Sequence, residues 1–124
     1  MHPRRYKSGG VFEDKVGYAR AVVAGGFVFV SGCVAPGDDV PEDVTDQCAA
    51  ALELIRRSLE QAGSDMARVV RVTYMLPNPD DFEPCWPLLK AAFGDHPPAA
   101  TMISCDLIHP RYKIEIEVTA LLIA

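Results

Sequence analysis

The most constraining feature of this sequence is one long amphipathic helix that stands between segments with strand-like patterns. Apolar residues recur at three- and four-residue steps, at Val44, Cys48, Ala51, Leu52, Ile55, Leu59 and Ala62. This spacing places them on one face of a helix. Acidic Glu42-Asp43 suits the positive end of the helix dipole, and Gly63 is placed to end the helix.

Several other segments have the composition and alternation of β-strands. The predicted strands are 18–24, 26–31, 68–76, 99–105 and 111–122, with a further short strand near Arg5–Lys7. The first two are joined at Gly25-Gly26, a tight hairpin signal. In the β-branched segment 68–76, Val70, Val72 and Tyr74 share one face. We expect this even-numbered face to be buried under helices.

A second helix is predicted after the stop signal Pro77-Asn78-Pro79-Asp80, with apolar positions at Phe82, Trp86, Leu89 and Phe93. Pro84 fits a first turn, whereas Pro87 removes an interior amide donor and should bend or delay the helix. Gly94 closes it. The order is β-β-α-β-α-β-β, which predicts one α+β domain over residues 1–124, with a mixed sheet and two helices on one face.

The second face of the sheet presents a difficulty for a monomer. With both helices on one face, Tyr18, Val22, Phe27 and Phe29, or the residues opposite them, would be left in water. An exposed apolar patch of this size usually marks an interface. The sequence therefore predicts a homo-oligomer.

The composition excludes several function classes. A net charge of -5 disfavours a nucleic-acid partner, which needs clustered Lys and Arg. The widely spaced cysteines Cys33, Cys48, Cys85 and Cys105 lie in apolar stretches, which favours reduced, buried thiols over disulfides or a metal site. The N-terminus lacks the apolar core of a signal peptide, and no apolar run is long enough to span a membrane. We expect a cytoplasmic protein with no membrane partner.

Motifs along the whole chain resemble those of the RidA/YjgF family of imine and enamine deaminases, also labelled endoribonuclease L-PSP. They are Val30-Ser31-Gly32, Asp81-Phe82, Phe93-Gly94, Pro98-Ala99-Ala100-Thr101 and the run from Lys113 to Ala120. The ungapped spacing from Ala100 to Glu115 adds to the resemblance. It implies a chorismate-mutase-like fold, a trimer whose sheets form a central barrel, a small-molecule substrate and no cofactor.

The resemblance also implies site residues. Glu115 would line an intersubunit cleft and position the water that attacks an imine carbon; its structural alternative is an ordinary solvent-facing residue. Tyr18 would close over the substrate from the neighbouring subunit, unless it only packs at a strand start. Ser31 and Gly32 would approach the ligand, since glycine permits close contact; alternatively they form a strand-ending turn. Glu117 would have a structural role at the trimer centre.

The chain departs from the family pattern at three positions of that implied pocket. Ala100 stands where the family's deaminases usually have the arginine that binds the substrate carboxylate, and no smaller residue replaces a bidentate guanidinium. Met102 stands where many have cysteine, and Trp86 where asparagine is frequent. Trp86 and Met102 could instead be ordinary core. Arg20 could supply a cation from another direction, although a surface or interface salt bridge is its simpler interpretation.

Three functions follow as hypotheses. The first is a hydrolase of reactive imines or enamines whose substrate is not a simple 2-imino acid. The second is a non-catalytic trimer that binds a small metabolite in its clefts. The third is an endoribonuclease, which the acidic composition and the absence of a His/Lys/Arg cluster disfavour.

Overall fold

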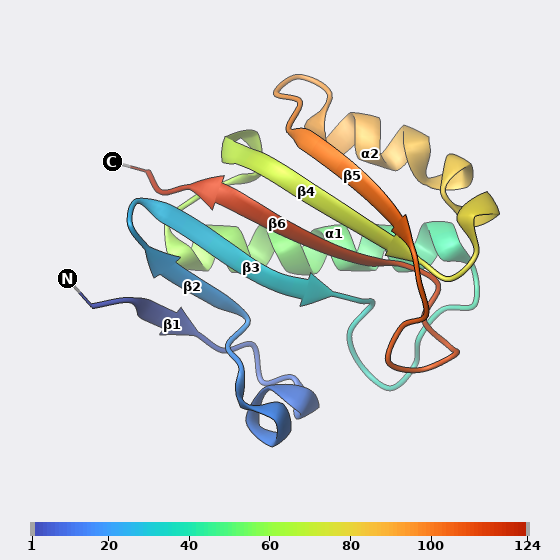
Figure 1. The fold of residues 1–124 in the computed structure, drawn as a ribbon, viewed down its shortest axis with the longest axis horizontal. Helices are drawn as coiled ribbons and strands as arrows, with labels where there is room; N and C mark the ends of the chain where they lie inside the picture. The colour runs from blue at the N-terminus through green and yellow to red at the C-terminus, as the bar shows by residue number, and fades with distance from the viewer. Residues whose placement is uncertain (1, 124) are drawn as a thin grey trace.

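The computed structural model describes residues 2–123 and shows one mixed sheet with helices on one side (Figure 1). Its strands are β1 (Arg4–Tyr6), β2 (Ala21–Ala24), β3 (Phe27–Cys33), β4 (Val69–Leu76), β5 (Ala99–Ser104) and β6 (Glu115–Leu121). The helices are α1 (Val44–Ala62) and α2 (Trp86–Phe93). Short turns of helix are η1 (Glu13–Gly17), η2 (Met66–Arg68), η3 (Pro79–Asp81) and η4 (Glu83–Cys85).

The strands lie in the order β1-β2-β3-β6-β4-β5. The β4–β5 pair is parallel, while the other neighbours are antiparallel. Side chains of α1 and α2 join those of the central strands in one apolar core, with Ile55, Leu59, Ile114 and Ile116 fully buried. The predicted α+β class, with a mixed sheet and helices, is confirmed.

The long helix forms where the apolar stripe predicted it. Asp43 is the N-cap, and its carboxylate accepts a hydrogen bond from the Thr45 amide at 2.8 Å. Gly63 ends the helix in the left-handed region, at φ 93°, where a residue with a Cβ would be strained.

Several elements begin later than predicted. Strand β2 starts at Ala21 instead of position 18, and β6 starts at Glu115 instead of 111. The second helix is delayed to Trp86, as Pro87 indicated, because prolines near the starts of η3, η4 and α2 divide the segment into short turns. Pro87 stands in the first turn of α2, where its missing amide leaves no helix hydrogen bond unmade.

The buried face of β4 differs from the prediction at one residue. Val72, Tyr74 and Leu76 are buried as expected, but Val70 is 39% exposed. The register with β6 shifts between Val69 and Arg71, so Val69 takes the buried place at the start of the strand. Strict alternation from the sequence could not include this irregularity.

The second face of the sheet is open in the single chain. Phe27, Phe29 and Leu121 are all exposed, and the two phenylalanine rings lie 6.1 Å apart between centroids. Tyr18 and Val22 are half-buried. The expected apolar patch is therefore present, centred on β3 and the end of β6.

Candidate functional site

An open cleft of about 690 Å³ is lined by residues 8–12 of the N-terminal segment, by residues just before β2 and by the adjoining ends of β3 and β6. Among its lining residues are Tyr18, Arg20, Ser31, Gly32, Glu115 and Glu117. Five of the eight predicted site residues thus line one cleft within a single chain: Tyr18, Arg20, Ser31, Gly32 and Glu115. Glu117, which also lines the cleft, was predicted to have a structural role.

A bulge in β3 shapes the floor of this cleft. Val30 pairs with Val118 and Cys33 pairs with Ile116, so two residues of β3, Ser31 and Gly32, lie opposite one residue of β6. The Ser31 hydroxyl donates to the Ala19 carbonyl at 2.7 Å, which ties the bulge to the residues before β2. The alternative of a strand-ending turn is wrong, because β3 continues to Cys33.

Gly32 makes room for the carboxylate of Glu115. A Cβ on Gly32 would lie 1.9 Å from one carboxylate oxygen of Glu115 and 2.9 Å from its Cδ. Both distances are shorter than any non-bonded contact allows. A residue with a Cβ at position 32 would therefore displace the Glu115 carboxylate from this place.

Glu115 is half-buried, with its side chain on the open face beside Glu117. Burial raises the pKa of its carboxyl, the nearby Glu117 charge raises it further, and Arg20 opposes both. Within residues 2–123 its carboxylate has no salt bridge and accepts no side-chain hydrogen bond. Glu117, by contrast, is exposed. A carboxyl with a raised pKa facing a cleft is suited to proton transfer.

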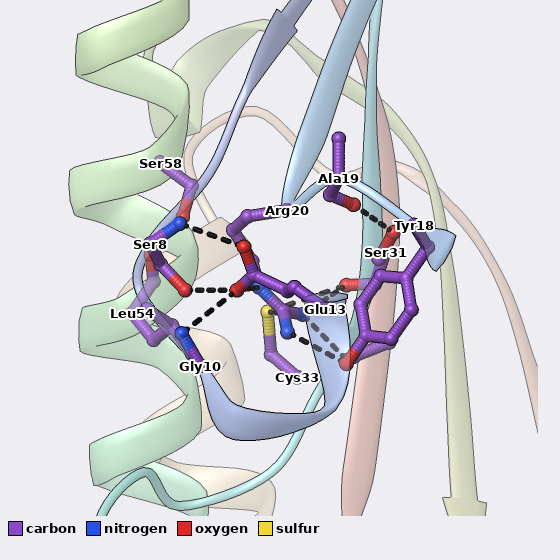
Figure 2. A network of polar contacts seen from close by, with 11 residues as sticks. Ser8, Gly10, Glu13, Tyr18, Ala19, Arg20, Ser31, Cys33, Leu54 and Ser58 are labelled. Atoms are coloured by element: carbon purple, nitrogen blue, oxygen red, sulfur yellow. Dashed lines mark hydrogen bonds and ion pairs between the residues drawn. The ribbon is translucent and has the colours of Figure 1, made fainter. Parts of the chain in front are cut away.

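Arg20 is not a surface residue, since only 7% of it is exposed. One terminal nitrogen donates to the Gly32 carbonyl at 2.7 Å, and the other lies 3.3 Å from the Tyr18 hydroxyl (Figure 2). The expected surface or interface salt bridge is wrong in its location: Arg20 forms a buried ion pair within the chain, with Nε 3.6 Å from a carboxylate oxygen of Glu13. Its charge is therefore committed to partners within the chain.

Glu13, which the sequence analysis did not single out, is a buried carboxylate next to Arg20. It is 1% exposed, and its carboxylate accepts hydrogen bonds from the Ser8 amide at 2.9 Å, from the Ser8 hydroxyl and from the Gly10 amide at 3.3 Å. Burial alone would raise its pKa, but these hydrogen bonds and the Arg20 charge hold the pKa of Glu13 below its usual value. In the sequence Glu13 stands beside Asp14, which is exposed, and nothing in the local pattern separates the two.

Trp86, Ala100 and Met102 lie elsewhere. Ala100 and Met102 are on β5, beside Val72 and Tyr74 of β4, and Trp86 begins α2, with its ring edge-on to Phe82. Trp86 is 51% exposed and Met102 is 37% exposed, so the alternative that they belong to the core is wrong. Within one chain these three residues do not line the cleft that holds Glu115.

The cysteines and other groups add no second site. All four cysteines are free, and burial raises the pKa of Cys33 to about 11 and of Cys48 to about 12, so both are unreactive thiols at neutral pH. Within residues 2–123, no group of three or more His, Cys, Asp and Glu is arranged to hold a metal ion. In the same residues, no helix is long and apolar enough to cross a membrane.

Comparison with known proteins now identifies the family. The family model described as Endoribonuclease L-PSP matches residues 12–122. A RutC family protein from Pyrococcus horikoshii is 32% identical over 107 residues, which cover 83% of this chain and 85% of the relative. A 2-iminobutanoate/2-iminopropanoate deaminase from Rattus norvegicus is 29% identical over 107 residues, covering 83% of this chain and 78% of the relative.

A solved structure agrees with these relatives. The crystal structure of Rv2704 from Mycobacterium tuberculosis, a member of the YjgF/YER057c/UK114 family, has a TM-score of 0.88 and 34% sequence identity. The match covers 98% of this chain and 100% of that one. The resemblance inferred from the motifs is therefore confirmed, and the chain belongs to the RidA/YjgF family, whose family model carries the description Endoribonuclease L-PSP.

Proposed function

We propose that this protein is a RidA-like hydrolase that deaminates a reactive imine or enamine in the cleft around Glu115. The observation that carries the proposal is the Glu115 carboxyl itself. The Glu115 carboxyl lies against Gly32, and a side chain at position 32 would displace it. The raised pKa of the Glu115 carboxyl suits this group to proton transfer. A deaminase among the relatives supports the same reaction class.

In the proposed reaction, Glu115 takes a proton from water as the water oxygen bonds to the imine carbon. The C=N double bond becomes a single bond, and Glu115 passes the proton it took from water to the nitrogen, which gives a carbinolamine. Glu115 then takes the proton of the carbinolamine hydroxyl and delivers it to the nitrogen as the C–N bond breaks, so that ammonia leaves and the carbon becomes a carbonyl. The substrate and one water give a carbonyl compound and ammonia, with no oxidant or cofactor consumed.

The substrate we propose is not a simple 2-imino acid. Ala100 offers no positive charge for a small carboxylate, and Arg20 is already bound to Gly32, Tyr18 and Glu13. The other guanidinium lining the cleft is that of Arg111, which lies over the Tyr112 ring at 5.0 Å and pairs with no carboxylate within residues 2–123. An acidic group on the substrate would therefore be bound at Arg111 instead.

We further propose a homotrimer whose sheets form a central barrel, so that the cleft is completed by a neighbouring subunit. The exposed rings of Phe27 and Phe29 support assembly, because burying apolar surface stabilises it by roughly 25 cal/mol per Å² before the costs of association. Light scattering should give the mass of three chains at micromolar concentration. A stable monomer would contradict the shared cleft. Location in the cytoplasm stays a prediction.

A non-catalytic small-molecule-binding trimer is the second candidate. The observation in its favour is that the cleft is large while position 100 lacks a cation. The third candidate, an endoribonuclease, requires attraction of phosphates, and a net charge of -5 with two glutamates in the cleft opposes this.

The decisive experiment compares two glutamates of one strand. Glu115→Gln is nearly isosteric but cannot take a proton from water, so ammonia release from enamines generated in situ should fall to background. Glu117→Gln, two residues along on the same face, is the matched control and should retain most of the activity. Equal activity in native protein and Glu115→Gln would contradict the proposed role of Glu115. No activity in the native protein, with a small molecule still bound, would contradict the deaminase proposal and favour the binding module.

A further inference from the structure

The mechanism above leaves one buried ion pair unused. Glu13 and Arg20 are 1% and 7% exposed, and Figure 2 shows their side chains next to each other within one network of polar contacts. Burying two charges is costly unless each is well partnered. A chain that only needed to hold residues 8–20 in place could do so with apolar side chains, so the pair calls for an explanation.

The contacts of Arg20 lead directly into the site. Its guanidinium donates to the carbonyl of Gly32, and the Glu115 carboxylate occupies the space where a Cβ of residue 32 would lie. The opposite terminal nitrogen reaches the Tyr18 hydroxyl, and the guanidinium carbon lies 5.5 Å from the centre of that ring. One side chain thus holds both Gly32 and Tyr18.

Glu13 fixes Arg20 and also Tyr18. Its carboxylate forms an ion pair with the Arg20 Nε at 3.6 Å, without a hydrogen bond to that nitrogen, while its backbone carbonyl accepts a hydrogen bond from the Tyr18 amide at 3.0 Å. That last bond closes the wide turn η1, a π-type turn of the kind often found at functional sites. The Ser8 and Gly10 contacts leave the carboxylate little freedom to move.

We propose that Glu13 is a positioning residue for the reaction: acting through Arg20, it fixes the Gly32 carbonyl and the Tyr18 hydroxyl around Glu115. Glu13 itself touches no substrate in this proposal. The inference rests on the proposed deaminase function for its kinetic test, but the arrangement of Glu13, Arg20 and Gly32 has consequences that do not depend on activity.

The neighbouring residue provides a matched control. Asp14 lies on the same turn and forms an ion pair with Lys7 at 2.6 Å, yet both partners are exposed, at 82% and 59% of their side chains. Glu13→Gln and Asp14→Asn each remove one charge from η1, with nearly unchanged size. If the Glu13–Arg20 ion pair only held this segment in place, Glu13→Gln and Asp14→Asn would differ in stability but not in catalytic activity.

The kinetic test measures kcat and KM for an enamine generated in situ. Glu13→Gln should lower kcat by about tenfold with KM little changed, because it disturbs the arrangement around Glu115 and not binding, whereas Asp14→Asn should match the native protein. Arg20→Lys should lower kcat similarly. The double variant Glu13→Gln/Arg20→Lys should be no worse than Arg20→Lys alone, since residues that act through one another are not additive. Independent, multiplying effects of the two substitutions, or a kcat unchanged by Glu13→Gln, would overturn the proposal.

A second measurement works without activity: titration of the Glu115 carboxyl by carbon NMR. The charged or titratable groups around it in the cleft are Glu117, Arg20, Asp38, Arg111, Tyr18 and Tyr112. Glu13→Gln leaves the Arg20 charge without its counter-ion, so the pKa of Glu115 should fall, and Asp14→Asn should leave it unchanged. An unchanged or raised midpoint in Glu13→Gln would overturn the coupling.

The outcomes for the two proposals are distinguishable. A native protein without deaminase activity would end the proposed function, while the titration would still decide the coupling. If Glu13→Gln fails to fold, Ser8→Ala replaces it: this variant keeps both charges and removes one hydrogen bond to Glu13. It should lower kcat by about two- to fivefold, and native kcat in Ser8→Ala would then overturn the proposal.

Discussion

The cleft end of the sheet and its opposite edge, strand β5, hold the predicted site residues in two very different states. At the cleft, Arg20, Ser31 and Gly32 are held by hydrogen bonds within the chain, and Gly32 in turn fits the Glu115 carboxylate. On β5, all six residues are exposed, Ala100 and Met102 among them. One region is assembled by a single chain, whereas the other is an uncovered edge strand, a surface that folded proteins normally cover.

This difference shows which predicted site residues meet within a single chain and which do not. The residues of the proposed proton-transfer site lie together at the cleft end, next to the buried Glu13–Arg20 ion pair. The positions that the resemblance assigns to substrate recognition, Trp86, Ala100 and Met102, face outward. They contribute to a site only if a second copy of the chain brings its cleft against β5, as the proposed trimer does.

The largest effect on activity is expected from Gly32→Ala, a substitution at the cleft end of the sheet. The added Cβ would overlap a Glu115 carboxylate oxygen, so that carboxylate must move, and we expect activity to fall by roughly a hundredfold or more. The control is Gly25→Ala in the β2–β3 turn, where φ is 59° and no atom lies within 4 Å of the new Cβ. It should cost about 1 kcal/mol of stability and leave turnover per folded protein unchanged. Native kcat/KM in Gly32→Ala would show that the contact with Glu115 has no role.

A smaller effect, with the opposite sign, is expected at the other edge. Ala100→Arg should improve kcat/KM for 2-aminoacrylate generated in situ, because a charge-assisted contact to a carboxylate is worth roughly 1.5–3 kcal/mol, or about ten- to a hundredfold. Trp86 and Met102 can crowd the new side chain, so Trp86→Asn should be combined with it. If the native protein already turns over this substrate efficiently, Arg111→Ala should remove that activity, since Arg20 is committed within the chain.

The smallest effect distinguishes two carboxylates of the cleft end by the pH dependence of stability. The pKa of Glu13 is lowered in the folded state, so its contribution is present above the unfolded value near 4.5 and is lost as pH falls through the folded value. The pKa of Glu115 is raised, so folding is favoured by its proton, and stability declines as pH rises from the unfolded value through the folded one.

Chemical denaturation at pH 4 and pH 7 would measure these opposite signs. Glu13→Gln should flatten the gain in unfolding free energy between the two pH values, whereas Glu115→Gln should enlarge it, because it removes a group that opposes the gain. If the unfolding free energy of both variants depended on pH in the same way, the two carboxyls would share one environment, and the opposite pKa shifts would be contradicted.

The fold was predictable from the sequence to the extent that it depends on periodicity. The stripe from Val44 to Ala62 repeats over five turns, and burying that stripe is the largest local gain available, so α1 forms where expected. Boundaries set by competition between neighbours were less predictable. The late start of α2 follows from three prolines acting together, and Val70 became exposed through a shift in pairing with a strand nearly fifty residues away.

For the site, the sequence by itself determined which groups are present: Glu115 with its motif, Gly32 after Ser31, and alanine at position 100. Only the tertiary structure decided which of them meet. Glu13 and Asp14 are neighbours with the same charge, yet one is buried against Arg20 and the other is in solvent. The physical reason is that the free energy of a charge depends on its burial and partners, and these are set by segments far apart in the chain.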